Sequence, residues 1–323
     1  MPNASPLLRG ISDVDSPDRV HHPPPPGRRR RPGLLPRVAP RPCQRTRAAA
    51  DARLPVRLAS VPPPHRRPRR PIPADRPDYP GFGHTHAPAG FTYSFDRLAD
   101  VTEGFVQRLG LDRFVMYIFD FGAPVGFRLA ERHPEWIAGL VVQNGNAYTE
   151  GLSDGARAFI ALRPETPGAE QTIRDLLTPT GVRAQYETGV ADPLLIAPDG
   201  WALDQYFLGL PGREEAQLAL AFDYHSNVER YDLWHAWLRE HTPPTLITWG
   251  SNDPFFPAPG AHAYLRDIPN AELHLFDTGH FALETHLPQI APLIADFLDR
   301  TWNQQDSAVQ QPGQSASGPD RTG

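Results

Sequence analysis

The stretch that decides the fold is residues 114–126, FVMYIFDFGAPVG. Its first six residues are continuously apolar, which is typical of a strand buried on both faces of a sheet. The strand ends at Asp120, and a helix is predicted over residues 123–132, stopping near Pro134. The sequence therefore places the Asp120 carboxylate in a sharp turn at the carboxyl end of a buried strand.

Strands and helices continue to alternate on both sides of this stretch. Apolar residues at helical spacing predict a helix over residues 93–109, ending at Gly110. Further apolar runs predict strands over 137–142 and 245–249, and another strand is predicted over 272–276, with helices near 258–266 and over 287–301. This alternation predicts an α/β fold, with a doubly wound, mostly parallel sheet and helices on both faces.

The predicted core is interrupted once. Residues 148–240 contain no strand of this kind and are rich in helices and turns. We therefore predict a helical cap over 148–240, inserted between core segments 78–147 and 241–302.

Two more polar residues follow predicted strands in the way that Asp120 does. Asp253 lies in the turn after strand 245–249, and His280 follows strand 272–276. Doubly wound sheets place their sites at the carboxyl ends of their strands. The chain order Asp120, Asp253, His280 also resembles the order nucleophile, acid, histidine of the α/β-hydrolase fold. We predict a catalytic triad of Asp120, Asp253 and His280. The alternatives are a helix N-cap for Asp120, a turn residue for Asp253 and a structural histidine.

Over residues 78–301, these motifs resemble the α/β-hydrolase fold superfamily. The Asp-aromatic-Gly form of residues 120–122 resembles its Asp-nucleophile branch, the epoxide hydrolases and haloalkane dehalogenases. YPGFG at 79–83 resembles the proline-glycine turn of the family, with Thr85 where serine is usual.

The resemblance implies both a mechanism and a substrate class. Asp120 would form an alkyl-enzyme ester, which water activated by His280 would hydrolyse while Asp253 orients the imidazole. The small organic substrate would carry a leaving group on a saturated carbon, such as a halide or a strained ring oxygen.

Within this branch the residues favour an epoxide hydrolase, with a haloalkane dehalogenase as the alternative. The resemblance implies that a dehalogenase would stabilise the departing halide with a Trp beside the nucleophile. Phe121 holds that position here. Phe121 is also expected to supply one backbone N–H of the oxyanion hole. Epoxide opening uses cap tyrosines to protonate the ring oxygen. The candidates are Tyr148 and Tyr224, with Tyr186 and Tyr206 in the same segment, and each could equally be a packing residue.

Residues 151–155, GLSDG, match the Gly-x-Ser-x-Gly pattern of serine hydrolases. That pattern needs a strand directly before the nucleophile, whereas residues 144–150, NGNAYTE, are polar and turn-like. Ser153 is therefore predicted to cap a helix, with a serine nucleophile as the alternative.

Both ends of the chain differ in composition from its middle. Residues 1–78 hold 17 Arg against 6 acidic residues, 19 of the 39 prolines, and no Phe, Trp or Tyr. Such a segment cannot bury enough apolar surface to offset its ordering entropy. We expect disorder over residues 1–77, and also over the Gln-, Ser- and Gly-rich tail 303–323. The alternative for 1–77 is a basic arm that touches nucleic acid or anionic surfaces, although nucleic-acid binding is not expected.

The family also needs an apolar strand followed by His-Gly-x-Pro, which supplies the other oxyanion N–H. Neither occurs in residues 1–77 as written. Read one nucleotide later, the codons of residues 47–50 can spell Val-Leu-Leu-Leu, those of 52–56 His-Gly-Phe-Pro, and those of 74–77 Arg-Ile-Ala-Pro. We hypothesise that residues 46–77 are a frameshifted reading, which leaves an inactive pseudo-enzyme as one alternative for the chain as written. Sequencing the codons of residues 1–78 tests this, because third-position bases that forbid the shifted motif would exclude it.

Other site and partner classes find little support in the sequence. No apolar run reaches the roughly 18 residues of a membrane-spanning helix, and the N-terminus lacks the apolar segment of a secretory signal. The single Cys43 excludes an internal disulfide, and no zinc-ligand spacing occurs. We expect a cytoplasmic protein with a small-molecule substrate, no membrane partner, no cofactor and no metal. The sequence leaves the oligomeric state open.

Overall fold

A computed structural model describes residues 47–49 and 74–309 of the chain. All of these residues belong to the unit formed by residues Gln44–Gly323. The segments predicted to be disordered, 1–77 and 303–323, therefore lie largely outside the described residues.

The centre of the fold is a six-stranded sheet whose neighbouring strands all pair in parallel. Its strands are β1 (Arg47–Ala49), β2 (Ala74–Asp75), β3 (Phe114–Phe119), β4 (Ile137–Gln143), β5 (Thr245–Gly250) and β6 (Glu272–Phe276). They lie in the order β2-β1-β3-β4-β5-β6. Because all the strands run in one direction, their carboxyl ends meet at a single edge of the sheet.

From β2 onward, at least one helix lies between each pair of successive strands. The α-helices are α1 (Phe95–Leu109), α2 (Gly122–Arg132), α3 (Asp154–Ile160), α4 (Ala169–Leu177), α5 (Pro179–Glu187), α6 (Pro198–Leu208), α7 (Arg213–Asp223), α8 (His225–Val228), α9 (Tyr231–His241), α10 (Pro259–Asp267) and α11 (Ala282–Val309). Short 3-10 helices are η1 (Pro134–Trp136), η2 (Thr149–Gly151) and η3 (Pro193–Leu195). The order confirms the predicted α/β class.

Alternate residues of β3 pack into different cores, so the strand is buried on both faces. Phe114, Met116 and Ile118 belong to the large cluster that includes residues of α1, α2, α9 and α10. Val115 instead packs with Phe297 of α11. A continuous apolar run is the consequence of covering both faces with helices, and the predicted doubly wound sheet is confirmed.

The start and end of α1 follow from two residues. Ser94 is the N-cap, and its hydroxyl accepts a hydrogen bond from the Arg97 N–H at 3.2 Å. Gly110 ends the helix in the left-handed conformation at φ 64°, which costs glycine little because it has no Cβ. The helix end predicted at Gly110 is confirmed.

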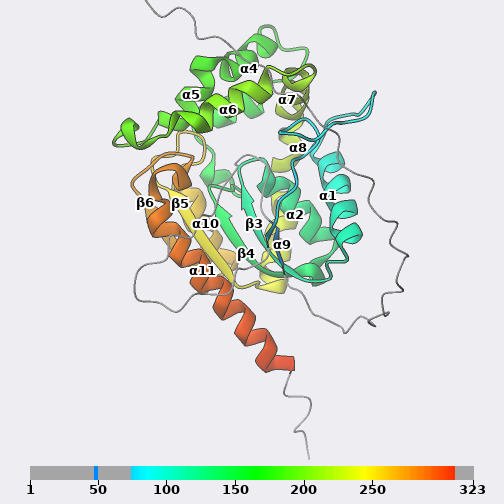
Figure 1. The fold of residues 1–323 in the computed structure, drawn as a ribbon, viewed down its shortest axis with the longest axis vertical. Coiled ribbons are helices and arrows are strands. Elements are labelled where there is room, and N and C mark those ends of the chain that lie inside the picture. The colour runs from blue at the N-terminus through cyan, green and yellow to red at the C-terminus, as the bar shows by residue number, and fades with distance from the viewer. Residues whose placement is uncertain (1–46, 50–73, 310–323) are drawn as a thin grey trace, which may run out of the picture. The chain divides into compact units, whose positions relative to one another are not determined.

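Helices α3 to α9 connect β4 to β5, and α4 to α7 gather beyond the carboxyl ends of the strands (Figure 1). Helix α9 belongs to the same connection but packs differently. Its Trp234 stacks on Phe127 of α2, with ring centroids 4.9 Å apart. The last helix of segment 148–240 therefore helps to cover the sheet, and the exact limits of core and cap stay a prediction.

The structure corrects the expectation that no strand precedes residue 78. Strand β1 pairs with β3 in parallel, with Arg47 opposite Phe114 and Ala49 opposite Met116. Backbone pairing satisfies the open edge of β3 and does not require an apolar sequence. These three residues fall within 47–50, the stretch that the shifted reading frame would turn into Val-Leu-Leu-Leu.

Helix α11 also differs from the prediction. It begins at Ala282, has non-helical dihedral angles at His286, and continues to Val309, inside the tail that we expected to be disordered. Residues 303–309 contain no Gly or Pro, and the next such residues are Pro312 and Gly313. The chain therefore carries no strong helix-breaking residue where the helix was predicted to stop. Across the described ranges, no helix is both long and apolar enough to span a bilayer.

Gly126 allows α2 to pack closely on its own strand. A Cβ at this position would lie 2.6 Å from Cγ2 of Ile118. We expect Gly126→Ala to destabilise the protein by about 1–3 kcal/mol because the core must shift. The matched control is Gly104→Ala in α1, where a Cβ meets nothing within 4 Å and the change should stabilise by about 0.5–1 kcal/mol. Urea unfolding of both variants checks this, and equal effects at the two positions would contradict it.

Candidate active site

Asp120 occupies a strained turn between β3 and α2. Its φ of 45° lies in the left-handed region, where a residue other than glycine costs on the order of 1–3 kcal/mol. The N-cap of α2 is Phe121, and no side chain caps the helix, so the alternative of Asp120 as the N-cap is wrong. Only 6% of Asp120 is exposed. The Asp120 carboxylate therefore lies buried, in a strained turn at the carboxyl end of β3.

Asp253 lies in the loop after β5 and accepts hydrogen bonds at both carboxylate oxygens. The backbone N–H groups of Phe255 and Phe256 donate to Oδ1 at 2.8 and 3.1 Å. Nδ1 of His280 lies 2.7 Å from Oδ2. This contact fixes the imidazole so that its other nitrogen, Nε2, points away from Asp253.

His280 connects the two carboxylates. Its Nε2 lies 3.8 Å from Oδ1 of Asp120, and the residue is 1% exposed. Burial opposes protonation of the imidazole, but the neighbouring carboxylates of Asp253 and Asp120 outweigh it and raise the pKa of His280 to about 9. The structure therefore brings the three predicted triad residues together, in the order Asp120, His280, Asp253.

The raised pKa of His280 predicts a pH-dependent stability. A histidine with a pKa of 6.5 when unfolded and about 9 when folded stabilises the fold fully below pH 6.5, and this contribution is lost as the pH rises through 9. We expect the free energy of unfolding to fall between about pH 6 and about pH 9.5, and His280→Gln to remove most of this slope. Urea titrations at several pH values measure it. The same slope in both proteins would show that another group is responsible.

Asn144 is a site residue that the sequence analysis missed. Its Nδ2 donates to Oδ2 of Asp253 at 2.7 Å, while its Oδ1 accepts from the backbone N–H of Gly250 at 2.9 Å. Like Asp120, it has a positive φ, of 39°. Asn144 directly follows β4, so the rule that selected Asp253 and His280 could have found it. Its role cannot be seen in the local sequence, because its partners Asp253 and Gly250 lie 109 and 106 positions away.

A cavity of about 410 Å³ opens onto Asp120 and His280. Its walls are mostly apolar and come from α3, α4, α7 and the loop after β5. Beyond the two site residues, its polar lining consists of Thr172, Gln185, Gln217 and Tyr224. Two predicted binding residues, Phe121 and Tyr224, line this cavity, with ring centroids 5.7 Å apart. An apolar cavity with a few converging polar groups is the usual form of a small-molecule site.

Tyr148, the other tyrosine predicted to bind substrate, does not line the cavity. Its hydroxyl donates to Oδ2 of Asp267 at 2.8 Å, and its ring stacks on His235. Burial and the Asp267 carboxylate raise the pKa of Tyr148 well above its ordinary value. The expectation for Tyr148 is therefore corrected: it fills the core, because its segment turns towards α10.

The remaining cap tyrosines and Ser153 lie outside this cavity too. The hydroxyl of Tyr186 donates to Oδ2 of Asp204 at 2.6 Å, and Tyr206 is 62% exposed on α6. Ser153 is the N-cap of α3 and accepts from the Ala156 N–H at 3.1 Å. The predicted capping role of Ser153 is confirmed. Among the described side chains, no three His, Cys, Asp or Glu residues gather as a metal site would require.

Comparison with known proteins agrees with this geometry. The α/β-hydrolase fold family matches residues 76–287. An uncharacterized hydrolase of Saccharomyces cerevisiae is 40% identical over 220 residues, covering 67% of this chain and 76% of that protein. Haloalkane dehalogenase 2 of Mycobacterium tuberculosis is 40% identical over 68 residues, 21% of this chain and 24% of that one.

A solved structure shares the architecture. It is the 2-hydroxy-6-oxo-6-phenylhexa-2,4-dienoate hydrolase from Rhodococcus sp. strain RHA1, with a TM-score of 0.60 at 15% identity, covering 80% of this chain and 92% of that one. The sheet order, the strained turn between β3 and α2 and the extent of the family match lead to one conclusion: this chain belongs to the α/β-hydrolase fold family.

Proposed function

We propose that this chain hydrolyses a small, mostly apolar molecule through an ester on Asp120, and that its preferred substrate is an epoxide. The observation that carries the proposal is a carboxylate in the strained turn between β3 and α2, with Oδ1 of Asp120 3.8 Å from Nε2 of His280. A carboxylate attacks a saturated carbon and leaves a covalent ester. The apolar cavity onto which it opens suits such a substrate.

The first half-reaction opens the ring. An oxygen of the Asp120 carboxylate bonds to an epoxide carbon while the bond from that carbon to the ring oxygen breaks. Tyr224 lines the same cavity and donates its phenolic proton to the ring oxygen as a general acid. The products of this step are a hydroxyalkyl ester on Asp120 and a Tyr224 phenolate.

The second half-reaction hydrolyses the ester. Esterification removes the Asp120 charge, one of the two carboxylate charges that raise the pKa of His280. The imidazolium therefore gives up its proton to the Tyr224 phenolate, and the neutral imidazole can then take a proton from water. The hydroxide adds to the ester carbonyl, and the alkoxide leaves with the proton from His280. The new Asp120 carboxylic acid gives its proton to the neighbouring His280, which restores the resting imidazolium and carboxylate. The balance is one epoxide and one water consumed and one diol released.

A haloalkane dehalogenase is the second candidate. Haloalkane dehalogenase 2 of M. tuberculosis is 40% identical to 68 residues of this chain. However, no Trp is among the described residues that line the cavity, whereas a phenol is. An indole N–H would stabilise a departing halide, while a phenol supplies the proton that an alkoxide leaving group needs. The lining therefore favours the epoxide.

Leaving groups of two kinds test the role of Tyr224. We expect Tyr224→Phe to lower kcat on an epoxide by about 10²–10⁴-fold, the usual loss of a general acid, and to spare an alkyl bromide of similar size, whose leaving group needs no proton. Tyr206→Phe, on the exposed side of α6, is the matched control and should change neither. Equal losses on both substrates would reject Tyr224 as the acid.

Isotope labelling tests the ester itself. In a single turnover in oxygen-18 water, the label should enter the Asp120 carboxylate, because water attacks the ester carbonyl. Peptide mass spectrometry would locate it. Label found only in the diol would show that water attacks the substrate directly, and would reject the Asp120 ester.

An inactive chain is the remaining alternative, because residues 1–77 as written lack the His-Gly-x-Pro motif. Losing one oxyanion donor costs on the order of 10²–10³ in rate. A folded wild-type chain that forms no ester on Asp120, but does so once the reading frame of residues 46–77 is repaired, would support this alternative.

A further inference from the structure

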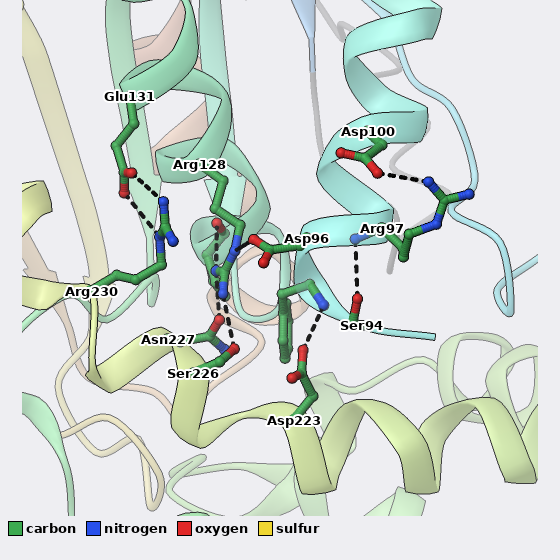
Figure 2. A network of polar contacts seen from close by, with 12 residues as sticks. Ser94, Asp96, Arg97, Asp100, Arg128, Glu131, Asp223, Ser226, Asn227 and Arg230 are labelled. Atoms are coloured by element: carbon green, nitrogen blue, oxygen red, sulfur yellow. Dashed lines mark hydrogen bonds and ion pairs between the residues drawn. The ribbon is translucent and has the colours of Figure 1, made fainter. Parts of the chain in front are cut away.

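We propose that Arg128 is a positioning residue that holds Tyr224 in place relative to Asp120. The inference rests on the proposed function, since it concerns the residue proposed to protonate the ring oxygen. Figure 2 shows the side chains involved, which come from α1, α2 and α8 and from the end of α7.

The Arg128 guanidinium joins three helices. Its Nε donates to Oδ1 of Asp96 in α1 at 2.7 Å, and its two terminal nitrogens donate to Oδ1 of Asn227 at 2.6 Å and to Oγ of Ser226 at 2.9 Å (Figure 2). Arg128 itself is 1% exposed and lies across the ring of Phe95 at 5.6 Å. A buried guanidinium with several partners in fixed directions holds those partners in one arrangement.

In the sequence, Tyr224 lies between two residues or groups of residues that bind neighbouring helices. Directly before it, Asp223 accepts a hydrogen bond from the backbone N–H of Phe95 at 2.7 Å. Two and three residues after it, Ser226 and Asn227 bind Arg128 (Figure 2). The backbone that carries Tyr224 is therefore fixed to α1 on one side and to α2 on the other.

Aromatic contacts complete the arrangement. The ring of Tyr224 lies 5.7 Å from both Phe95 and Phe121, measured between centroids, and Phe121 directly follows Asp120. Helix α2, which carries Arg128, begins at Gly122. Arg128 thus fixes α8 to the same helix that follows the nucleophile. The separation of the phenol from the Asp120 carboxylate depends on this contact.

The same helix provides a matched control one turn further on. Arg132 pairs with Asp100 and Glu103 of α1 at 2.9 and 3.1 Å, as Arg128 pairs with Asp96, and in these pairs its side chain is 30% exposed. The described contacts of Arg132 do not include α8. Arg128→Lys and Arg132→Lys therefore make the same chemical change, and each keeps a cation beside α1. Only the first removes the directed bonds to Ser226 and Asn227, because an ammonium cannot reproduce the guanidinium fork.

The experiment measures kcat on an epoxide and on an alkyl bromide for both variants. We expect Arg128→Lys to lower kcat on the epoxide about tenfold, which corresponds to about 1.4 kcal/mol in the barrier, and to leave the bromide within about twofold. Arg132→Lys should change neither rate. A purely structural role for Arg128 would lower both rates together, and that result would overturn the proposal.

A double-mutant cycle tests whether Arg128 acts through Tyr224. In the Tyr224→Phe background, Arg128→Lys should cause no further loss on the epoxide, because residues that act together are not additive. A full additional tenfold loss would overturn the proposal. If Tyr224→Phe alone has no effect on the epoxide, then the proposed acid has failed; if only Arg128→Lys has none, then the inference alone has failed.

Hydrogen exchange gives a readout that needs no turnover. The backbone amides of residues 224–228 should exchange faster in Arg128→Lys and at the wild-type rate in Arg132→Lys. Should Arg128→Lys fail to fold, Ser226→Ala removes one bond from the same guanidinium and leaves its ion pair with Asp96 intact. Unchanged exchange over 224–228 in every folded variant of this network would overturn the proposal.

Discussion

Asp120→Ala is expected to abolish turnover, with kcat on an epoxide or an alkyl bromide reduced by about 10⁴-fold or more, as for the loss of a nucleophile in a catalytic triad. Alanine removes the atom that attacks the substrate carbon, and His280 has no route to form the ester without it. The positive φ of Asp120 is strained for alanine as well, so thermal unfolding is needed to check that the variant is folded. Steady-state kinetics on both substrates measure the loss.

Ser153→Ala is the control, because Ser153 occupies the nucleophile position of the Gly-x-Ser-x-Gly pattern. Its hydroxyl caps α3, so the variant should lose about 0.5–2 kcal/mol of stability and keep its kcat. A serine-dependent rate together with an active Asp120→Ala protein would replace the aspartate mechanism with a serine one.

His280→Gln is expected to stop the reaction halfway. Asp120 forms its ester without help from a base, but ester hydrolysis needs the imidazole to activate water. We expect one equivalent of substrate to be consumed rapidly, followed by turnover slowed by about 10³-fold or more. Intact-protein mass spectrometry should show the mass of the protein increased by that of one substrate molecule.

The matched control is His235→Gln. His235 is partly buried and hydrogen-bonds the Ala147 carbonyl at 2.8 Å, and it does not line the cavity. The His235→Gln variant should turn over substrate at the wild-type rate without accumulating an adduct. If His280→Gln formed no adduct either, then His280 would be needed in the first half-reaction. That result would contradict the proposal that Asp120 forms its ester without a base.

The residues of the proposed triad could be selected from the sequence because each follows a predicted strand. Phe114–Phe119, Thr245–Trp249 and Glu272–Phe276 were predicted as strands, and each is a strand in the structure. Parallel strands bring their carboxyl ends to one edge, so residues in the turns that follow these ends come close together. Local pattern and fold class together were enough to predict that Asp120, Asp253 and His280 are neighbours.

The cap could not be interpreted in the same way. Tyr148 and Tyr224 are both aromatic residues in helical, turn-rich sequence, yet one bonds to Asp267 and the other lines the cavity. The difference depends on how separate helices pack, and a helix has no rule equivalent to the strand end that says where a side chain will lie. The sequence therefore could not show that Tyr148 lies in the core and not at the cavity.

The sequence by itself determined the strands, the fold class and the positions from which the proposed triad comes, because each depends on short-range apolar patterns. Only the tertiary structure showed that Asn144 holds Asp253 and that Arg128 holds the segment around Tyr224. The two contacts join residues that are 109 and 99 positions apart. A side-chain hydrogen bond acts over about 3 Å and leaves no periodic trace in the sequence. Such contacts are therefore visible only once the chain has folded and brought them together.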